Sequence, residues 1–264
     1  MRIALGVEYD GRGFHGWQAQ QKGVRTVQVT LEQALSKVAD HPLRVVCAGR
    51  TDTGVHALGQ VVHFDTDAVR SERNWLLGSN VNLPPDVSVT WVREVSSEFS
   101  ARFSAVSRRY RYFILNRTAR SAVLAGRVTW VHRPLDAEAM HRAGQALVGE
   151  HDFSSYRALG CQAKSPVRTL HSLVVERHGD FVVLSVHANA FLHHMVRNIA
   201  GVLIAIGKGD RPETWAGEVL ALRDRTLGGV TAPPEGLYFE QVEYPPEFGI
   251  PTPTLSGFPC EGVF

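Results

Sequence analysis

The order of strand and helix patterns constrains the fold of this chain more than any other feature of its sequence. Apolar periodicity in the first half predicts strands over 2–9, 43–48, 60–64 and 87–95, and helices over 27–39 and 72–81. A glycine-containing loop joins the second and third of these strands. The resulting order is β-α-β-β-α-β.

The second half of the chain has the same order. We expect strands over 109–116, 168–176, 181–187 and 237–244, and helices over 136–148 and 191–206, with a short strand at 128–130 and a helix at 213–222 inserted. Two such halves predict an α+β fold in which each half is ferredoxin-like or RRM-like. Their mostly antiparallel sheets would join into one platform, with helices on one face and a cleft between the halves. The expected boundaries are 1–105, 106–244 and a Pro-rich acidic tail over 245–264.

Composition narrows the class of protein. The chain has 264 residues, of which 44% are hydrophobic and 20% charged, so it can bury a substantial core. No apolar run reaches the ~18 residues that a membrane span needs, and the first residues lack a signal-peptide layout. The three cysteines lie far apart, which excludes a dense disulfide scaffold. These features predict a cytoplasmic protein without a membrane segment.

The distribution of charge is more informative than the formal net charge of +2. The chain has 24 arginines and only 4 lysines, and nine of the arginines lie between Arg93 and Arg133, where Glu94 and Glu98 are the only acids. The flat guanidinium group suits phosphates and stacks on bases, so the bias favours a nucleic-acid ligand. A solvated surface explains the same bias, and the residue counts leave both readings open.

Two short motifs suggest other functions. Residues Gly11–Gly16 match G-x-G-x-x-G, but no helical pattern begins before Val27, which argues against a dinucleotide site. Phe14 and Trp17 in this segment could contact a nucleic acid or form a structural turn. The sequence Asp52-Thr53-Gly54 resembles an aspartic protease motif, yet it occurs once, whereas that chemistry needs two aspartates sharing a proton.

Twelve histidines raise the question of a metal. His193 and His194 are adjacent, so they would point in different directions on a helix and lack the i, i+4 spacing of a zinc motif. We therefore expect no metal site.

The densest polar cluster lies over 47–57, between two apolar strands. Loops on a rigid sheet often carry reactive groups. Asp52 is flanked by Arg50 and His56, whose positive charge would favour an ionised carboxylate. With no second acid at a suitable spacing, this carboxylate is a candidate nucleophile or single base. A structural ion pair with Arg50 remains the alternative.

Motifs along the whole chain point to one family. The segment Gly49–Ala57 reads GRTDTGVHA, and further motifs follow in order at 9–11, 16–18, 26–32, 60–64, 109–112, 149–153, 191–198 and 232–237. Together they resemble the TruA family of tRNA pseudouridine synthases up to Tyr244. One departure is Ser100, where many members have histidine.

This resemblance implies an isomerase that converts uridine to pseudouridine at positions 38, 39 and 40 in the anticodon stem-loop of tRNA, without a cofactor. Asp52 matches the essential aspartate, which acts at the sugar carbon or as a base. Tyr110 matches a tyrosine that stacks on the target base, although a packed strand aromatic is the simple alternative.

The remaining implied site residues are two arginines. Arg50 would pair with Asp52 and help to extrude the nucleotide from its helix. Arg197 would extend from the polar edge of the helix expected over 191–206, unless it is merely solvent-exposed. The resemblance also implies a homodimer. An inactive tRNA-binding or tRNA-folding protein of the same fold is the second hypothesis.

Overall fold

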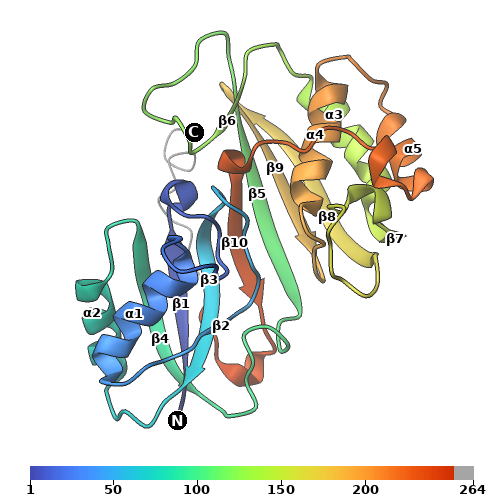
Figure 1. The fold of residues 1–264 in the computed structure, drawn as a ribbon. Coiled ribbons are helices and arrows are strands. Elements are labelled where there is room, and N and C mark those ends of the chain that lie inside the picture. Colours follow the sequence, from blue (N-terminus) through green and yellow to red (C-terminus); the bar gives the residue numbers. More distant parts are fainter. Residues whose placement is uncertain (253–264) are drawn as a thin grey trace. The chain divides into compact units, whose positions relative to one another are not determined.

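The computed structural model describes residues 1–252 of the chain, which divides into two compact units. Among the described residues, the first unit contains Met1–Val106 and 238–252, and the second unit begins at Ser107 and continues to Leu237. Each unit contains a sheet and the helices that cover it (Figure 1).

In the first unit, the strand order is β4-β1-β3-β10, with a short β2 beside β3. The bounds are Arg2–Tyr9 (β1), Val46–Cys47 (β2), His56–Asp65 (β3), Val87–Val95 (β4) and Leu237–Glu243 (β10). β1 pairs antiparallel with both β3 and β4. β10 runs parallel to β3, with Tyr238 opposite His56. Through this pairing the chain returns to the first unit after it has formed the second. The order of the predicted elements did not indicate this pairing.

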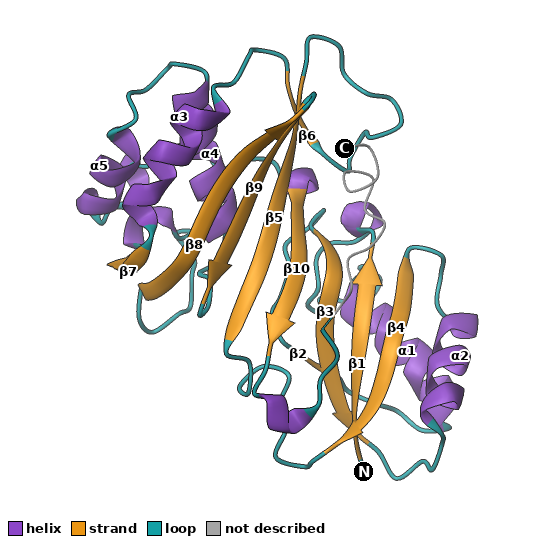
Figure 2. Cartoon of the chain, turned by 180° about the vertical axis from the view of Figure 1, so that it is seen from behind, coloured by secondary structure: helices purple, strands orange, loops and turns teal. Residues whose placement is uncertain are grey.

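The two helices of the first unit are α1 (Val27–Ala39) and α2 (Glu72–Asn82). Each begins at a hydroxyl residue, because Thr26 accepts a hydrogen bond from the Val29 amide and Ser71 accepts one from the Asn74 amide. The helices lie side by side against the sheet (Figures 1 and 2). The core beneath them is fully buried and includes Leu5, Leu31, Leu35, Phe64 and Trp75.

In the second unit, the strands form an antiparallel sheet of order β5-β9-β8-β7, and β6 pairs with β5 in parallel. The bounds are Ser107–Asn116 (β5), Thr129–Val131 (β6), Gly149–Asp152 (β7), Val167–His178 (β8) and Phe181–Ala188 (β9). Helices α3 (Ala137–Gly144), α4 (Met195–Gly207) and α5 (Trp215–Leu222) pack together beside this sheet (Figure 2). A Cβ on Gly144 would lie 2.3 Å from the Leu173 side chain, so helix α3 and strand β8 are in close contact.

The predicted α+β class is confirmed, and β1, α1 and β4 have the predicted bounds. The strand predicted over 43–48 is reduced to Val46–Cys47. Side chains of α1 cause this difference: Ser36 accepts a hydrogen bond from the Leu43 amide, and Glu32 accepts one from the Val45 amide. The backbone donors that a strand would use are therefore bound to a helix.

The predicted helices of the second half are too long. The helix expected from residue 191 begins at Met195, because His194 has a φ of 61° and cannot continue a right-handed helix backwards. The helix expected over 136–148 ends at Gly144 and tightens into a 3₁₀ turn over Gln145–Leu147. Strand β7 was not predicted.

The start of the predicted tail is packed on the first unit. Pro246–Phe248 forms a short 3₁₀ turn, and the Phe248 ring lies 5.3 Å from that of Phe99. Residues 253–264 of the predicted tail lie outside the described residues. Within 1–252, no helix combines the length and the apolar character that crossing a bilayer requires.

His63 on β3 contacts the segment that follows Phe99, and its titration should make the stability of the protein depend on pH. Its Nδ1 accepts a hydrogen bond from the Ala101 amide at 3.0 Å. Burial lowers the pKa of His63, the charge of Arg2 lowers it further, and Asp65 opposes both. Because the pKa is lower in the folded state, the unfolded chain binds more protons, and stability should fall as the pH drops below about 6.5.

We therefore predict that replacing His63 with asparagine, which keeps an acceptor but cannot titrate, flattens the loss of melting temperature between about pH 7 and pH 5. Thermal denaturation across that range measures it. His15→Asn, at an exposed position, is the control and should follow the wild type. If the melting temperature depended on pH equally in the wild type and His63→Asn, His63 would not be the cause of the acid sensitivity.

Candidate active site

The loop between β2 and β3, residues 48–55, carries the candidate carboxylate Asp52, and a buried amide fixes its start. Gln60 on β3 is fully buried and donates from Nε2 to the Gly49 carbonyl at 2.6 Å. Its Oε1 accepts from the Gly49 amide at 3.4 Å. The sequence reading missed this role of Gln60, although a polar residue inside an apolar strand was the available signal.

The glycine-rich segment 11–17 packs directly against this loop. The Trp17 amide donates to the Thr51 carbonyl at 3.0 Å, and the Gly54 amide donates to the Phe14 carbonyl at 3.4 Å. Both aromatic side chains are buried, at 1% exposure for Trp17 and 2% for Phe14. The segment is thus the structural turn of the two alternatives, because neither ring is available to a nucleic acid.

Two glycines allow this close approach. Gly16 has a φ of +82°, and a Cβ there would lie 2.8 Å from the Thr51 carbonyl oxygen. A Cβ on Gly11 would lie 2.1 Å from the carbonyl oxygen of Val55. The G-x-G-x-x-G match therefore reflects backbone contact with the Asp52 loop and not a phosphate site.

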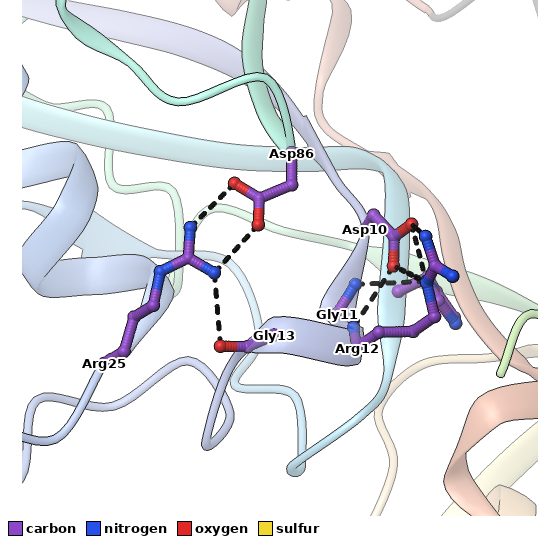
Figure 3. Close-up of polar contacts among 7 residues, drawn as sticks. Asp10, Gly11, Arg12, Gly13, Arg25 and Asp86 are labelled. Carbon is purple, nitrogen blue, oxygen red and sulfur yellow. Dashed lines mark hydrogen bonds and ion pairs between the residues drawn. The ribbon is translucent and has the colours of Figure 1, made fainter.

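Ion pairs hold the first part of the glycine-rich segment, as Figure 3 shows. Arg25 donates to both carboxylate oxygens of Asp86 at 2.8 Å and to the Gly13 carbonyl at 3.2 Å. Arg12 donates to Asp10 at 2.7 Å. Burial alone would raise the pKa of Asp10, but hydrogen bonds from Arg12 outweigh it, and the pKa is lowered to about 2.

A hydroxyl pair fixes the residue before Asp52. The Tyr9 hydroxyl lies 2.8 Å from Oγ1 of Thr51, and both side chains are buried. Burial raises the pKa of Tyr9, so its phenol stays protonated and can donate. On the other side of Asp52, the Val55 amide donates to the Asp52 carbonyl at 3.2 Å, and Gly54 has a φ of +79°. The half-buried Asp52 therefore sits in a turn that is held on both sides.

His56 supports the fold of the loop. Its Nδ1 accepts from the Gly11 amide at 3.0 Å and lies 3.4 Å from Asp10, and its ring stacks on Tyr238 at 4.5 Å. The ring of His56 also helps to lower the pKa of the Asp10 carboxyl. Its effect on the charge of Asp52 stays a prediction.

Positive charge near the loop comes from two arginines. Burial raises the pKa of the Cys47 thiol to about 12, while the charges of Arg50 and Arg102 act in the opposite direction. Both arginines are exposed. The thiol remains protonated at neutral pH and is no nucleophile. Arg102 was counted only as part of the arginine-rich stretch, because nothing in sequence spacing brings it near Cys47.

Tyr110 lies on β5 in the second unit, where it is 9% exposed. Its ring meets that of Phe191 edge-on, with centroids 4.9 Å apart. Tyr112, on the same face, is fully buried, and its hydroxyl lies 2.6 Å from Thr129 and donates to the Pro233 carbonyl at 2.8 Å. This face of the strand is buried yet polar.

Arg197 lies on α4, also in the second unit. It is half-buried, its Nε donates to the Ala232 carbonyl at 2.9 Å, and its own carbonyl accepts from the Ala232 amide at 3.0 Å. Asn198 was predicted on the polar edge of this helix but is 2% exposed, because its side chain donates to the Tyr156 carbonyl and accepts from Arg225. The predicted residues thus divide between the units, with Arg50 and Asp52 in the first and Tyr110 and Arg197 in the second.

The chain is similar to known proteins along almost its whole length. It matches the family described as tRNA pseudouridine synthase over residues 6–104 and 143–245. A protein named tRNA pseudouridine synthase A from Nitrosococcus oceani is 62% identical over 251 residues, which cover 95% of this chain and 96% of that protein. Proteins of the same name from Alcanivorax borkumensis and Pseudomonas aeruginosa are each 60% identical. Those matches cover 96% and 95% of this chain, and 95% and 88% of the relatives, respectively. The chain belongs to the tRNA pseudouridine synthase family.

The Tyr9–Thr51 contact predicts a specific loss of activity. Tyr9→Phe removes one buried hydroxyl, which should cost about 1 kcal/mol of stability. If the contact orients Asp52, the single-turnover rate of pseudouridine formation should fall by about 10- to 100-fold while tRNA affinity is unchanged. Rapid-quench kinetics and a binding titration measure the two effects.

Tyr156→Phe is the matched control, because its fully buried hydroxyl donates to the Ala216 carbonyl in the second unit. It should lose similar stability and keep its rate. Equal rates for the two variants would show that Tyr9 has only a structural role.

Proposed function

We propose that the protein converts uridine to pseudouridine at positions 38, 39 and 40 in the anticodon stem-loop of tRNA. The single observation that carries the proposal is the loop of Asp52, which is held on one side by the Tyr9–Thr51 contact and on the other by the turn at Gly54. Membership of the tRNA pseudouridine synthase family supports the reaction type.

The reaction is an isomerisation, which explains why no cofactor is needed. The bond from C1′ to N1 of uracil breaks, the base turns, and a bond forms from C1′ to C5. The proton on C5 leaves, and N1 gains one, so atoms and electrons balance. An ionised Asp52 suits attack on C1′ or removal of a sugar proton, because departure of uracil leaves positive character on the ribose.

The other candidate residues would act on the base and its strand. Tyr110 would stack on the uracil, and its phenol could move the proton from C5. Arg50 would pair with Asp52 and assist extrusion of the nucleotide. Arg197, whose Nε donates to the Ala232 carbonyl, would bind the substrate with its positively charged side chain.

Part of the arginine-rich stretch is already engaged. Arg93 pairs with Glu72, Arg117 with Asp180 and Arg133 with Asp210, all at the surface. The proposal that the stretch follows the RNA backbone rests on the clustering of its positive charge. In keeping with the family resemblance, we also propose a homodimer that works in the cytoplasm.

The function is tested by incubating unmodified tRNA with the protein, without added metal or nucleotide, and mapping pseudouridine by carbodiimide treatment and mass spectrometry. We expect modification at positions 38 to 40 of tRNAs that carry uridine there. Unmodified product, or pseudouridine confined to other positions, would contradict the proposal. A protein that binds tRNA but yields no pseudouridine would support the inactive alternative.

Two variants of Tyr110 separate stacking from proton transfer. Tyr110→Leu removes the ring and should weaken capture of the base by about 1–3 kcal/mol. Tyr110→Phe keeps the ring; if the phenol moves the C5 proton, this variant should bind tRNA normally and lose turnover by roughly 10²- to 10⁴-fold. Affinity and single-turnover rate are measured for both. Full activity in both variants would exclude Tyr110 from the site.

A further inference from the structure

The segment 99–106 of the first unit presents an aromatic ring to solvent. Phe103 is 80% exposed, the largest exposure of any aromatic side chain among the strongly exposed apolar residues of the described chain. The Arg102 guanidinium lies over this ring, with its central carbon 5.1 Å from the ring centroid. One face of the ring is thus paired with a cation.

The backbone on both sides of Phe103 is firmly anchored. Phe99 is fully buried against Tyr244 and Phe248, at centroid distances of 5.0 and 5.3 Å. The Ala101 carbonyl accepts from the Tyr244 hydroxyl at 2.6 Å, and the Ala101 amide donates to His63.

The turn itself is held by a serine pair. The Ser104 amide donates to the Ser100 carbonyl at 2.9 Å, and Ser104 Oγ accepts from the Ser100 amide at 3.0 Å. Ser100 Oγ accepts from the Phe103 amide at 3.3 Å. Ser100 is the residue at which the sequence departs from many relatives, and here it orders the turn. The backbone that carries the exposed ring is therefore held in place by hydrogen bonds.

The same segment lies close to the candidate catalytic loop. The Ala101 amide donates to His63, and His63 pairs with Val46 on β2, the strand that ends immediately before that loop. Arg102 and Arg50 both act electrostatically on the thiol of Cys47, the last residue of β2. An exposed ring next to a guanidinium suits a nucleotide, because a base can stack on the open face while the cation faces a phosphate. A single ring offers far less area than the roughly 800 Å² per partner of a stable protein interface.

We propose that the Arg102–Phe103 pair is a stacking site for an unpaired base of the tRNA anticodon loop, beside the uridine that reacts at Asp52. The proposal rests on the proposed function, since it assigns a second contact to the same substrate. In the complex, the base lies on the face of Phe103 opposite Arg102.

The test compares tRNA affinity for wild type, Phe103→Leu and Phe103→Trp. Loss of the ring should weaken binding roughly 5- to 150-fold, which corresponds to the 1–3 kcal/mol of base–aromatic stacking, and tryptophan should restore it. Val81→Ala, at an 84% exposed position on α2, is the control and should bind as wild type. Circular dichroism and melting temperature check that each variant is folded.

A second set of measurements identifies the base. Ligated tRNAs that each lack one base of the anticodon loop are titrated against wild type and Phe103→Leu. One abasic tRNA should bind more weakly to wild type and show no further loss with Phe103→Leu, because the two changes remove the same contact.

The proposal is overturned if Phe103→Leu binds tRNA as wild type does, or if every abasic penalty is the same in both proteins. It is also overturned if Phe103→Leu changes only the sedimentation behaviour, which would assign the ring to a contact between protein copies. Failure of the proposed function is distinct: the wild type would then form no pseudouridine, whatever the binding data show.

Discussion

The hydrogen bond from the Trp17 amide to the Thr51 carbonyl joins the two segments on which the candidate site depends. It requires the chain after β1 to approach the Asp52 loop so closely that a side chain at Gly16 or Gly11 would collide with its backbone. The buried rings of Phe14 and Trp17 and the ion pairs of Arg12 and Arg25 hold that chain in place. The backbone position of the Asp52 loop thus depends on contacts throughout the first unit.

Sequence periodicity predicted the elements well where apolar residues follow the helix or strand period and backbone donors pair within the helix or the sheet. β1, α1 and β4 are such cases. It failed where side chains compete for the backbone, as Glu32 and Ser36 do for the amides of 43–45. It also failed at His194, whose left-handed backbone depends on tertiary contacts that no local pattern encodes.

The sequence predicted the reactive group of the candidate site, but it did not predict the contacts of the residues around that group. The dense polar segment around Asp52 was visible from composition and from the family motifs. The contacts of His56 were not, because the amide that donates to its ring lies 45 residues away in sequence. The roles of Gln60, Tyr9 and Arg102 likewise depend on contacts between distant segments, which a single sequence does not specify.

The central claim is that the carboxylate of Asp52 performs the chemistry and is not needed for folding or for tRNA binding. Asp52→Asn keeps the size of the side chain and removes its charge. Single-turnover assay of this variant on unmodified tRNA, with affinity measured in parallel, tests the claim most directly. We predict that pseudouridine formation is abolished while tRNA affinity and melting temperature are unchanged. Retained turnover in the folded variant would contradict the account, because the chemistry would then belong to another group.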